Sequence, residues 1–178
     1  HSWIINGKET PSLNDIIKEI DSMMSKEDTR FATLMHGDAC FSNILYDFKS
    51  KTIKLIDPRG LDLDGNFSIW GDFRYDVGKL AHSIVGMYDF IIGGRFEYKE
   101  KSPYDVELYF EDNPTISSLQ DYFLNLKIAG YSVMELSVYP VLIHLFLSML
   151  PLHSDYPERQ KAFLANALRL YVKMKKSL

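Results

Sequence analysis

The sequence has little cysteine, no excess of positive charge and no long hydrophobic run. Cys40 is the single cysteine in 178 residues, so no disulfide forms within the chain, and we expect a reducing, cytoplasmic setting with Cys40 as a packing residue. The net charge of -4 offers no basic field to nucleic acid. The most apolar segment, residues 138–152, is too short to span a bilayer and contains Pro140 and His144. It predicts a buried helix and no membrane insertion.

Several common motifs are also absent. The first ten residues, HSWIINGKET, lack the basic and apolar regions of a signal peptide. No G-x-G-x-x-G occurs, and Gly93 and Gly94 form an isolated pair. No Cys and His residues have the spacing of zinc ligands. The chemistry of this chain must therefore rest on other residues.

Composition and periodicity predict one folded domain, residues 1–178, of the α+β class and mostly helical. Hydrophobic residues make up 46% of the chain and aromatic residues 13%, as in globular proteins. Helical spacing predicts helices at 13–24 behind an N-cap at Ser12, from Asp72 to 90, at 116–128, at 133–149 with a kink or division at Pro140, and at 158–175 after Pro157. Alternation predicts a hairpin of strands 43–46 and 52–56, a loop at 61–70, and two strands within 96–110 around the turn at 102–103.

The segment LMHGDACFSNILYDFKSKTIKLIDPRG, residues 34–60, places polar residues at fixed spacing beside two apolar strands. Asn43 follows Asp38 by five positions, and Asp57 follows the second strand. Transfer of a phosphoryl group from a nucleotide needs a carboxylate beside the acceptor hydroxyl and hard oxygen ligands for Mg²⁺. Asp38 can meet the first need, and Asn43 and Asp57 the second.

Three motifs together carry a resemblance to a known family. H-G-D-x-x-x-x-N at residues 36–43, followed by I-D at 56–57, resembles the catalytic core of the aminoglycoside phosphotransferase and choline kinase superfamily, distant relatives of protein kinases. Residues 71–77, GDFRYDV, resemble the G-D-P-x-x-D-L segment that follows the metal aspartate in that superfamily. The resemblance is close over residues 34–80. It implies the C-terminal lobe of a protein-kinase-like fold, with a small β-hairpin beside the catalytic loop.

The resemblance also implies a role for each matching residue. Asp38 would be the catalytic base facing the acceptor hydroxyl. Asn43 and Asp57 would bind Mg²⁺ and, through it, the phosphates of ATP or another nucleoside triphosphate. His36 would hold the loop by a side-chain hydrogen bond, and Asp76 would anchor the loop backbone from below.

Each of these residues has an alternative interpretation. Asp38 and Asn43 could be turn residues that bond to their own backbone. Asp57, which precedes a proline, could end its strand in an extended conformation. Asp76 could be either a helix cap or a loop anchor, and Asp72 is predicted to be no more than an N-cap.

Other polar residues are less informative. Arg59 could reach a phosphate or an acidic acceptor, or it could pair with Asp62 or Asp64 at the surface. His82 and His144 lie in apolar helical segments and are predicted to be hydrogen-bonded core histidines.

The sequence departs from the family in two respects. Asp57 is followed by Pro-Arg-Gly rather than Phe-Gly. A complete kinase also has an N-terminal lobe with a glycine-rich turn and a lysine that bind the nucleotide phosphates. Only 35 residues precede His36, too few for that lobe. We therefore expect residues 1–178 to be the C-terminal lobe alone, inactive or nearly so without the missing N-terminal lobe of the same protein.

The expected function is an ATP- and magnesium-dependent phosphotransferase that acts on a hydroxyl of a small molecule, namely a sugar, an amino alcohol or an aminoglycoside. A bacterial kinase of surface-polysaccharide precursors is favoured among these, because residues 149–163 resemble such proteins. The alternatives are a catalytically silent binding module and a domain of a larger biosynthetic enzyme. Five further acids could line a pocket for a cationic acceptor or form a solvated surface: Asp62, Asp64, Glu107, Glu111 and Asp112.

Overall fold

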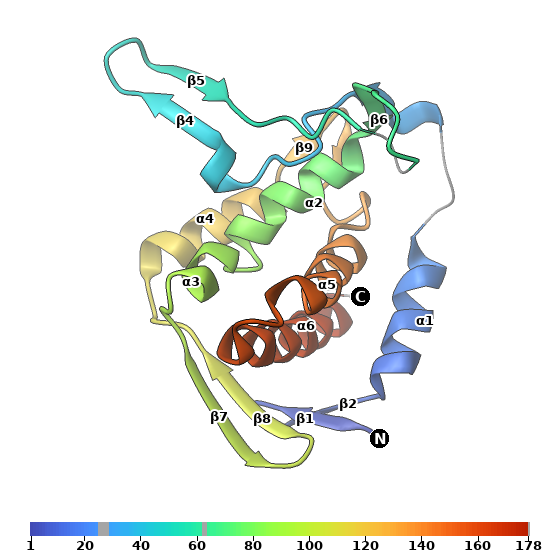
Figure 1. Ribbon diagram of the computed structural model, residues 1–178, viewed down its shortest axis with the longest axis vertical. Helices are drawn as coiled ribbons and strands as arrows, with labels where there is room; N and C mark the ends of the chain where they lie inside the picture. The colour runs from blue at the N-terminus through green and yellow to red at the C-terminus, as the bar shows by residue number, and fades with distance from the viewer. Residues whose placement is uncertain (25–28, 62–63, 178) are drawn as a thin grey trace.

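The computed structural model describes residues 1–24, 29–61 and 64–177 and confirms the α+β class, with 47% helix and 22% strand (Figure 1). Its α-helices are α1 (Leu13–Met23), α2 (Phe73–Ile84), α3 (Tyr88–Ile92), α4 (Pro114–Leu124), α5 (Val138–Ser148) and α6 (Pro157–Ser177). Its strands are β1 (Trp3–Ile5), β2 (Lys8–Thr10), β3 (Ala32–Leu34), β4 (Ile44–Asp47), β5 (Thr52–Leu55), β6 (Trp70–Asp72), β7 (Glu97–Ser102), β8 (Asp105–Tyr109), β9 (Lys127–Ile128) and β10 (Tyr131–Ser132). Short 3₁₀ turns lie at Thr29–Phe31, Phe41–Asn43 and Pro151–His153.

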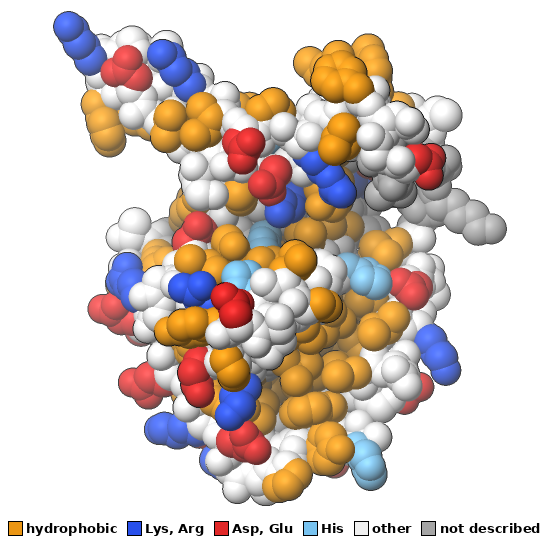
Figure 2. Space-filling model, viewed as in Figure 1, with side chains coloured by type: hydrophobic (Ala, Val, Ile, Leu, Met, Phe, Trp, Pro, Cys, Tyr) orange, Lys and Arg blue, Asp and Glu red, His pale blue; other side chains and the backbone are white. Residues whose placement is uncertain are grey.

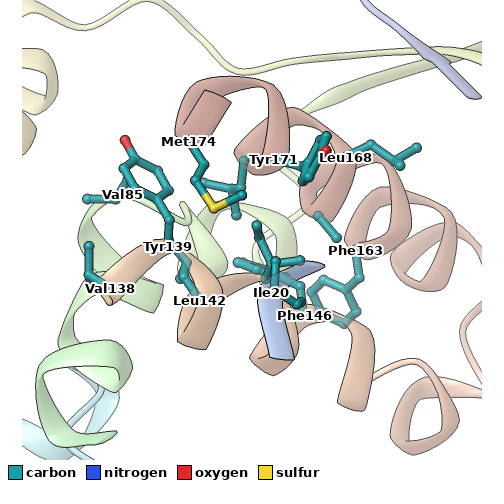
Figure 3. Close-up of a cluster of buried hydrophobic side chains, with 14 of the residues drawn as sticks. Ile20, Val85, Val138, Tyr139, Leu142, Phe146, Phe163, Leu168, Tyr171 and Met174 are labelled. Carbon is teal, nitrogen blue, oxygen red and sulfur yellow. The ribbon is translucent and has the colours of Figure 1, made fainter. Parts of the chain in front are cut away.

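The hydrophobic core lies among the helices, and α5 passes through it (Figure 3). Both Leu142 and Phe146 of α5 are fully buried, as are Phe163 and Leu168 of α6. A helix that is apolar on all sides is expected inside a protein rather than at its surface. The predicted buried helix is thereby confirmed. No helix in the described residues combines the length and apolar character needed to cross a membrane.

A four-stranded sheet closes one end of the molecule in the order β2-β1-β8-β7. The β7–β8 hairpin confirms the two strands predicted within 96–110. Strands β1 and β2 were not predicted, although Asn6 and Gly7 between them form the Asn-Gly turn that is typical of tight hairpins. Both residues have a positive φ, 50° and 72°, as that turn requires.

Two small antiparallel pairs at the other end frame the loop of interest. The β4–β5 hairpin confirms the strands predicted at 43–46 and 52–56. Strand β3 pairs with β6, with Thr33 opposite Gly71. This pairing places the start of the His36 loop directly beside the start of α2. The predicted loop at 61–70 ends in strand β6, which the sequence did not indicate.

Helix α2 begins where it was predicted but ends earlier. Asp72 is its N-cap, since its Oδ1 accepts a hydrogen bond from the backbone N–H of Arg74 at 2.9 Å. The helix stops at Ile84 instead of continuing to residue 90. Met87, with a φ of 59°, leaves the helical conformation, and α3 then begins at Tyr88.

The other helix boundaries show two corrections. Helix α5 begins at Val138, so Pro140 lies in its first turn, where a backbone N–H has no acceptor within the helix. The predicted kink at Pro140 was therefore wrong. Helix α4 spans 114–124 rather than 116–128, and residues 127–128 form β9. The predicted N-cap at Ser12 and the start of α6 at Pro157 are confirmed.

His82 of α2 is a buried histidine without a hydrogen-bond partner among the described residues. It is 1% exposed, stacks on Tyr88 with ring centroids 4.5 Å apart and contacts Phe146 edge-on with ring centroids 4.2 Å apart. The expectation of a hydrogen-bonded core histidine was wrong for this residue. His144 is bonded, with its Nε2 2.7 Å from Asp21 Oδ1, but it lies at the surface rather than in the core.

We expect His82 to make stability depend on pH. Burial, and secondarily the charge of Lys79, lower the pKa of His82 from 6.5 to about 3. The pKa of His82 is lower in the folded state than in the unfolded state. The stability that depends on neutral His82 is therefore fully present above pH 6.5 and is lost as the pH falls toward 3. The loss is on the order of 4 kcal/mol. Urea unfolding at pH 7, 5 and 4 should show a shallower decline for His82→Leu than for the wild type, and equal declines would contradict this prediction.

Candidate active site

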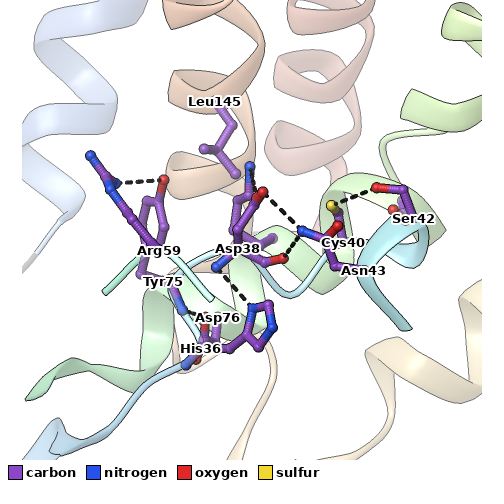
Figure 4. A network of polar contacts seen from close by, with 12 residues as sticks. His36, Asp38, Cys40, Ser42, Asn43, Arg59, Tyr75, Asp76 and Leu145 are labelled. Carbon is purple, nitrogen blue, oxygen red and sulfur yellow. Dashed lines mark hydrogen bonds and ion pairs between the residues drawn. The ribbon is translucent and has the colours of Figure 1, made fainter. Parts of the chain in front are cut away.

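Helix α2 anchors the loop at residues 36–43 through a carboxylate. Asp76 accepts hydrogen bonds from the backbone N–H groups of His36 and Gly37, each at 2.8 Å (Figure 4). Asp72 already caps the helix, so Asp76 is free to hold the loop. Of the two interpretations that the sequence left open for Asp76, the structure shows the loop anchor.

Two more side chains of α2 contact the same loop. Lys79 Nζ lies 2.6 Å from Asp38 Oδ1, and Ser83 Oγ accepts a hydrogen bond from the backbone N–H of Phe41 at 3.0 Å. Asp76, Lys79 and Ser83 are three and four positions apart, which places them on one face of the helix. The loop therefore lies along α2 and is held at three points.

Asp38 and Asn43 are bonded to each other across the loop. Asn43 Nδ2 donates to the backbone oxygen of Asp38 at 2.9 Å and to its Oδ2 at 3.0 Å. Asn43 is buried, and the Asp38 side chain is partly exposed although its Oδ1 is covered. The two residues thus fix one another's side chains instead of forming separate turns. Cys40 between them is buried, as a packing residue should be.

His36 links the loop to the segment that follows β5. Its Nδ1 accepts a hydrogen bond from the backbone N–H of Asp38 at 3.3 Å, so the proton resides on Nε2, which donates to the oxygen of Ile56 at 2.9 Å. The backbone oxygen of His36 accepts from the N–H of Arg59 at 2.9 Å. His36 therefore holds the chain on both sides of Asp57.

Asp57 adopts an unusual backbone conformation between these two bonds. Its φ is 57°, in the left-handed region that few residues other than glycine adopt. The extended conformation considered for a residue before proline was therefore wrong. Non-glycine residues in this region store strain and cluster at functional sites. Here the conformation turns the chain at the end of β5 back toward the His36 loop.

A hollow of about 350 Å³ lies here, and both Asp38 and Asp57 line it. Its lining residues come from the loop, the segment after β5 and α2: Gly37, Asp38, Asp57, Pro58, Arg59, Tyr75 and Lys79. Burial alone would lower the pKa of Lys79, but its hydrogen bond and Coulombic attraction to Asp38 outweigh this effect and raise the pKa. Lys79 is thus a cation beside the predicted base.

Arg59 contributes a second cation to the hollow. Its NH1 donates to Tyr75 Oη at 3.4 Å. Of the two acids considered as surface partners, Asp62 lies outside the described residues, and no ion pair joins Arg59 to a described acid. The lining of the hollow thus holds two cations, Arg59 and Lys79, and two carboxylates, and Lys79 is paired with Asp38.

Two of the acids proposed for a cationic acceptor pocket are engaged elsewhere. Glu107 pairs with Lys101 at 2.5 Å, and Glu111 pairs with Arg95 at 3.1 Å. Strands β7 and β8 lie at the end of the molecule opposite the β4–β5 hairpin (Figure 1). Neither acid lines the hollow at Asp38.

The structure adds residues that sequence reasoning missed. Lys79 and Ser83 were not considered, nor was Tyr75. The signal was present, since Lys79 and Ser83 follow Asp76 at helical spacing, but it became readable only after Asp76 was known to face the loop. Among the described residues, no group of three or more His, Cys, Asp or Glu side chains is arranged to hold a metal ion.

An exposed apolar surface surrounds the hollow. Most of the exposed large hydrophobic side chains among the described residues fall between residues 34 and 70. Figure 2 shows such side chains gathered over the β4–β5 hairpin and around β6. Phe48 is 86% exposed and Phe67 is 82% exposed. Apolar patches of this kind mark surfaces that bind a ligand or another protein segment.

Comparison with known proteins does not extend these observations. No family model, no curated protein and no solved structure matches this chain. The function of the site is therefore inferred from its own geometry.

Proposed function

We propose that this chain carries the base and the metal ligands of an ATP- and magnesium-dependent phosphotransferase, in a lobe related to the C-terminal lobe of kinases. One observation carries the proposal. Asp38 and Asp57, which are 19 positions apart in the sequence, line one hollow, and Asn43 is hydrogen-bonded to Asp38. This arrangement supports the proposal because phosphoryl transfer uses a carboxylate beside the acceptor hydroxyl together with carboxylate and amide oxygen ligands for Mg²⁺.

The proposed chemistry begins at Asp38. Its carboxylate orients the acceptor hydroxyl and accepts its proton as the oxygen attacks the terminal phosphorus of the nucleotide. The new bond joins the acceptor oxygen to phosphorus, and the bond to the nucleoside diphosphate breaks. Asn43 fixes the direction of this carboxylate through its hydrogen bond to Oδ2. Positioning of this kind supplies much of the catalysis in phosphoryl transfer.

The residues present fit a magnesium ion. Mg²⁺ keeps several waters and is bound by one or two carboxylates together with substrate phosphates, so it does not need three protein acids. Asp57 is exposed and lines the hollow. Asn43 is buried and does not line the hollow, but its backbone oxygen accepts a hydrogen bond from the N–H of Ile56, next to Asp57. Its amide nitrogen is engaged with Asp38, so its amide oxygen would be the ligand. When bound, the ion would offset charge on the phosphates. Asp57 and Asn43 would hold it.

The exposed apolar surface is a second observation that supports the proposal. The sequence contains no glycine-rich turn to cover nucleotide phosphates. Asn43 directly precedes β4 and Asp57 follows β5, so both lie at the open end of the hairpin that carries these exposed side chains. We propose that a nucleotide-clamping lobe of the same protein packs on this surface. The nucleotide would then be held between that lobe and the hollow.

The acceptor belongs to the class of small hydroxylated molecules, and a screen of the full-length protein tests the proposal. ATP consumption should be measured with sugars, amino alcohols and aminoglycosides, using the Asp38→Asn variant as the blank. We expect one class to raise consumption in the wild type only. Nucleotide binding without consumption for any class would favour the catalytically silent binding module.

We expect Asp57→Ala in the full-length protein to weaken magnesium-dependent nucleotide binding at least about tenfold, because a carboxylate ligand is lost. Calorimetric titration with ATP, with and without Mg²⁺, measures this. Asp112→Ala, which removes an exposed acid that does not line the hollow, is the control. Equal losses with and without Mg²⁺ would show that Asp57 does not bind the metal.

A further inference from the structure

Lys79 is a charged residue in the hollow to which the proposed mechanism has so far given no part. Its side chain is 17% exposed, and its Nζ lies 2.6 Å from Asp38 Oδ1. Removing an ammonium group from water is unfavourable, and surface lysines avoid it. An apolar side chain at this position in the middle of α2 could still have packed on the loop. Packing alone therefore does not explain a lysine at this position.

The position of the Lys79 ammonium group relative to the proposed reaction explains why a lysine is found here. Asp38 would face the acceptor hydroxyl, and the phosphoryl group to be transferred lies next to that hydroxyl. A cation in contact with Asp38 and lining the same hollow is thus beside the transferred group. Phosphoryl transfer relies on Lys, Arg and metal cations to offset charge on these oxygens.

Lys79 also has N–H groups that can donate further hydrogen bonds. A lysine ammonium has three N–H donors, and the only ion pair of Lys79 among the described residues is with Asp38. Two donors therefore remain for phosphate oxygens. Arg59, the other cation of the hollow, is exposed and donates to Tyr75, so its guanidinium is less firmly placed. Helix α2, which is anchored to the loop at Asp76, holds Lys79 in register with the base.

We propose that Lys79 binds the terminal phosphoryl group of the nucleotide and holds it against Asp38. This inference rests on the proposed function and deepens it, since it assigns a phosphate-binding residue to α2. The ion pair between Lys79 and Asp38 is then the state of the site before the nucleotide binds. On binding, the ammonium group bridges the base and the phosphoryl group.

Nucleotide affinity tests the inference independently of turnover. In the full-length protein, Lys79→Met should raise the Kd for MgATP about tenfold and leave the Kd for MgADP within about twofold, because only ATP has the terminal phosphoryl group. The value of kcat should fall about 100-fold. Lys175→Met, which breaks an ion pair of similar length between Lys175 and Glu19, should change neither affinity.

The outcomes separate this inference from the proposed function. Equal losses for MgATP and MgADP in Lys79→Met, or no loss for either, would overturn the role of Lys79. Asp38→Asn should keep the wild-type ratio of the two Kd values, and a ratio that collapsed as in Lys79→Met would show that Lys79 acts only through Asp38. A wild-type protein that bound neither nucleotide would instead overturn the proposed function, and the role of Lys79 with it.

Discussion

Replacing Asp38 with Asn is expected to lower kcat about 1000-fold in the full-length protein while the Kd for MgATP stays within about threefold. The amide keeps the shape of the side chain but cannot accept the proton of the acceptor hydroxyl. Nucleotide binding depends on other residues of the hollow, in particular Asp57. Steady-state kinetics with the acceptor found in the screen, together with calorimetric titration of the nucleotide, measures both quantities.

The substitution also removes the anionic partner of Lys79, so folding must be controlled. Leaving a half-buried cation without its partner destabilises the protein, and a lower Tm is expected. Asp38→Glu keeps the charge but moves the carboxylate by one methylene, and it should lose turnover with a smaller change in Tm. Wild-type turnover in Asp38→Asn would show that another residue is the base. Turnover near wild type in Asp38→Glu would show that the position of the carboxylate is not critical.

Replacing Asp76 with Ala is expected to cause the largest combined loss of stability and activity. Two backbone N–H groups, those of His36 and Gly37, would lose a charged acceptor at 2.8 Å. Each such loss costs about 1.5–3 kcal/mol, so the free energy of unfolding should fall by roughly 3–6 kcal/mol. Because the loop carries Asp38 and Asn43, kcat should fall and the Kd for MgATP should rise together. Urea unfolding and kinetics measure these effects.

Asp72→Ala is the matched control for this prediction. Asp72 lies four positions earlier, caps α2 and pairs with Arg74, whereas the backbone N–H groups of His36 and Gly37 donate to Asp76. Loss of an N-cap costs about 1 kcal/mol, and kcat should change little. If Asp76→Ala and Asp72→Ala caused equal losses of stability and of kcat, Asp76 would stabilise only the start of the helix and would not anchor the loop. Asp76→Asn, which retains one good acceptor, should fall between the two.

The elements predicted with most success were those with a local signal. The hairpin β4–β5 followed from alternation around a polar turn, and the start of α2 followed from Asp72. The sequence was less informative where tertiary context decides. Pro140 suggested a kink, yet the helix begins only two residues before it, so the proline sits where no N–H is needed. Strands β1 and β2 were missed because each has only three residues.

In the candidate site, too, features with a local sequence signal were predicted and features that depend on tertiary contacts were not. The spacing of His36, Asp38 and Asn43 identified the loop, since these residues lie on one short segment. The sequence could not choose between a cap and an anchor for Asp76, because that choice depends on which backbone groups the β3–β6 pairing brings to it. It gave no sign that His82 would be buried without a partner, because burial depends on Tyr88 and Phe146 from other elements.

By itself the sequence determined the α+β class, the loop with its candidate base and the candidate metal ligands, because periodicity and short-range spacing are local properties of the chain. Only the tertiary structure decided that Asp57 turns back toward Asp38 and that Lys79 stands beside the base. Both depend on contacts between segments far apart in sequence: His36 with residues 56 and 59, and α2 with the loop. Such contacts form when the segments pack together, and no local pattern encodes them.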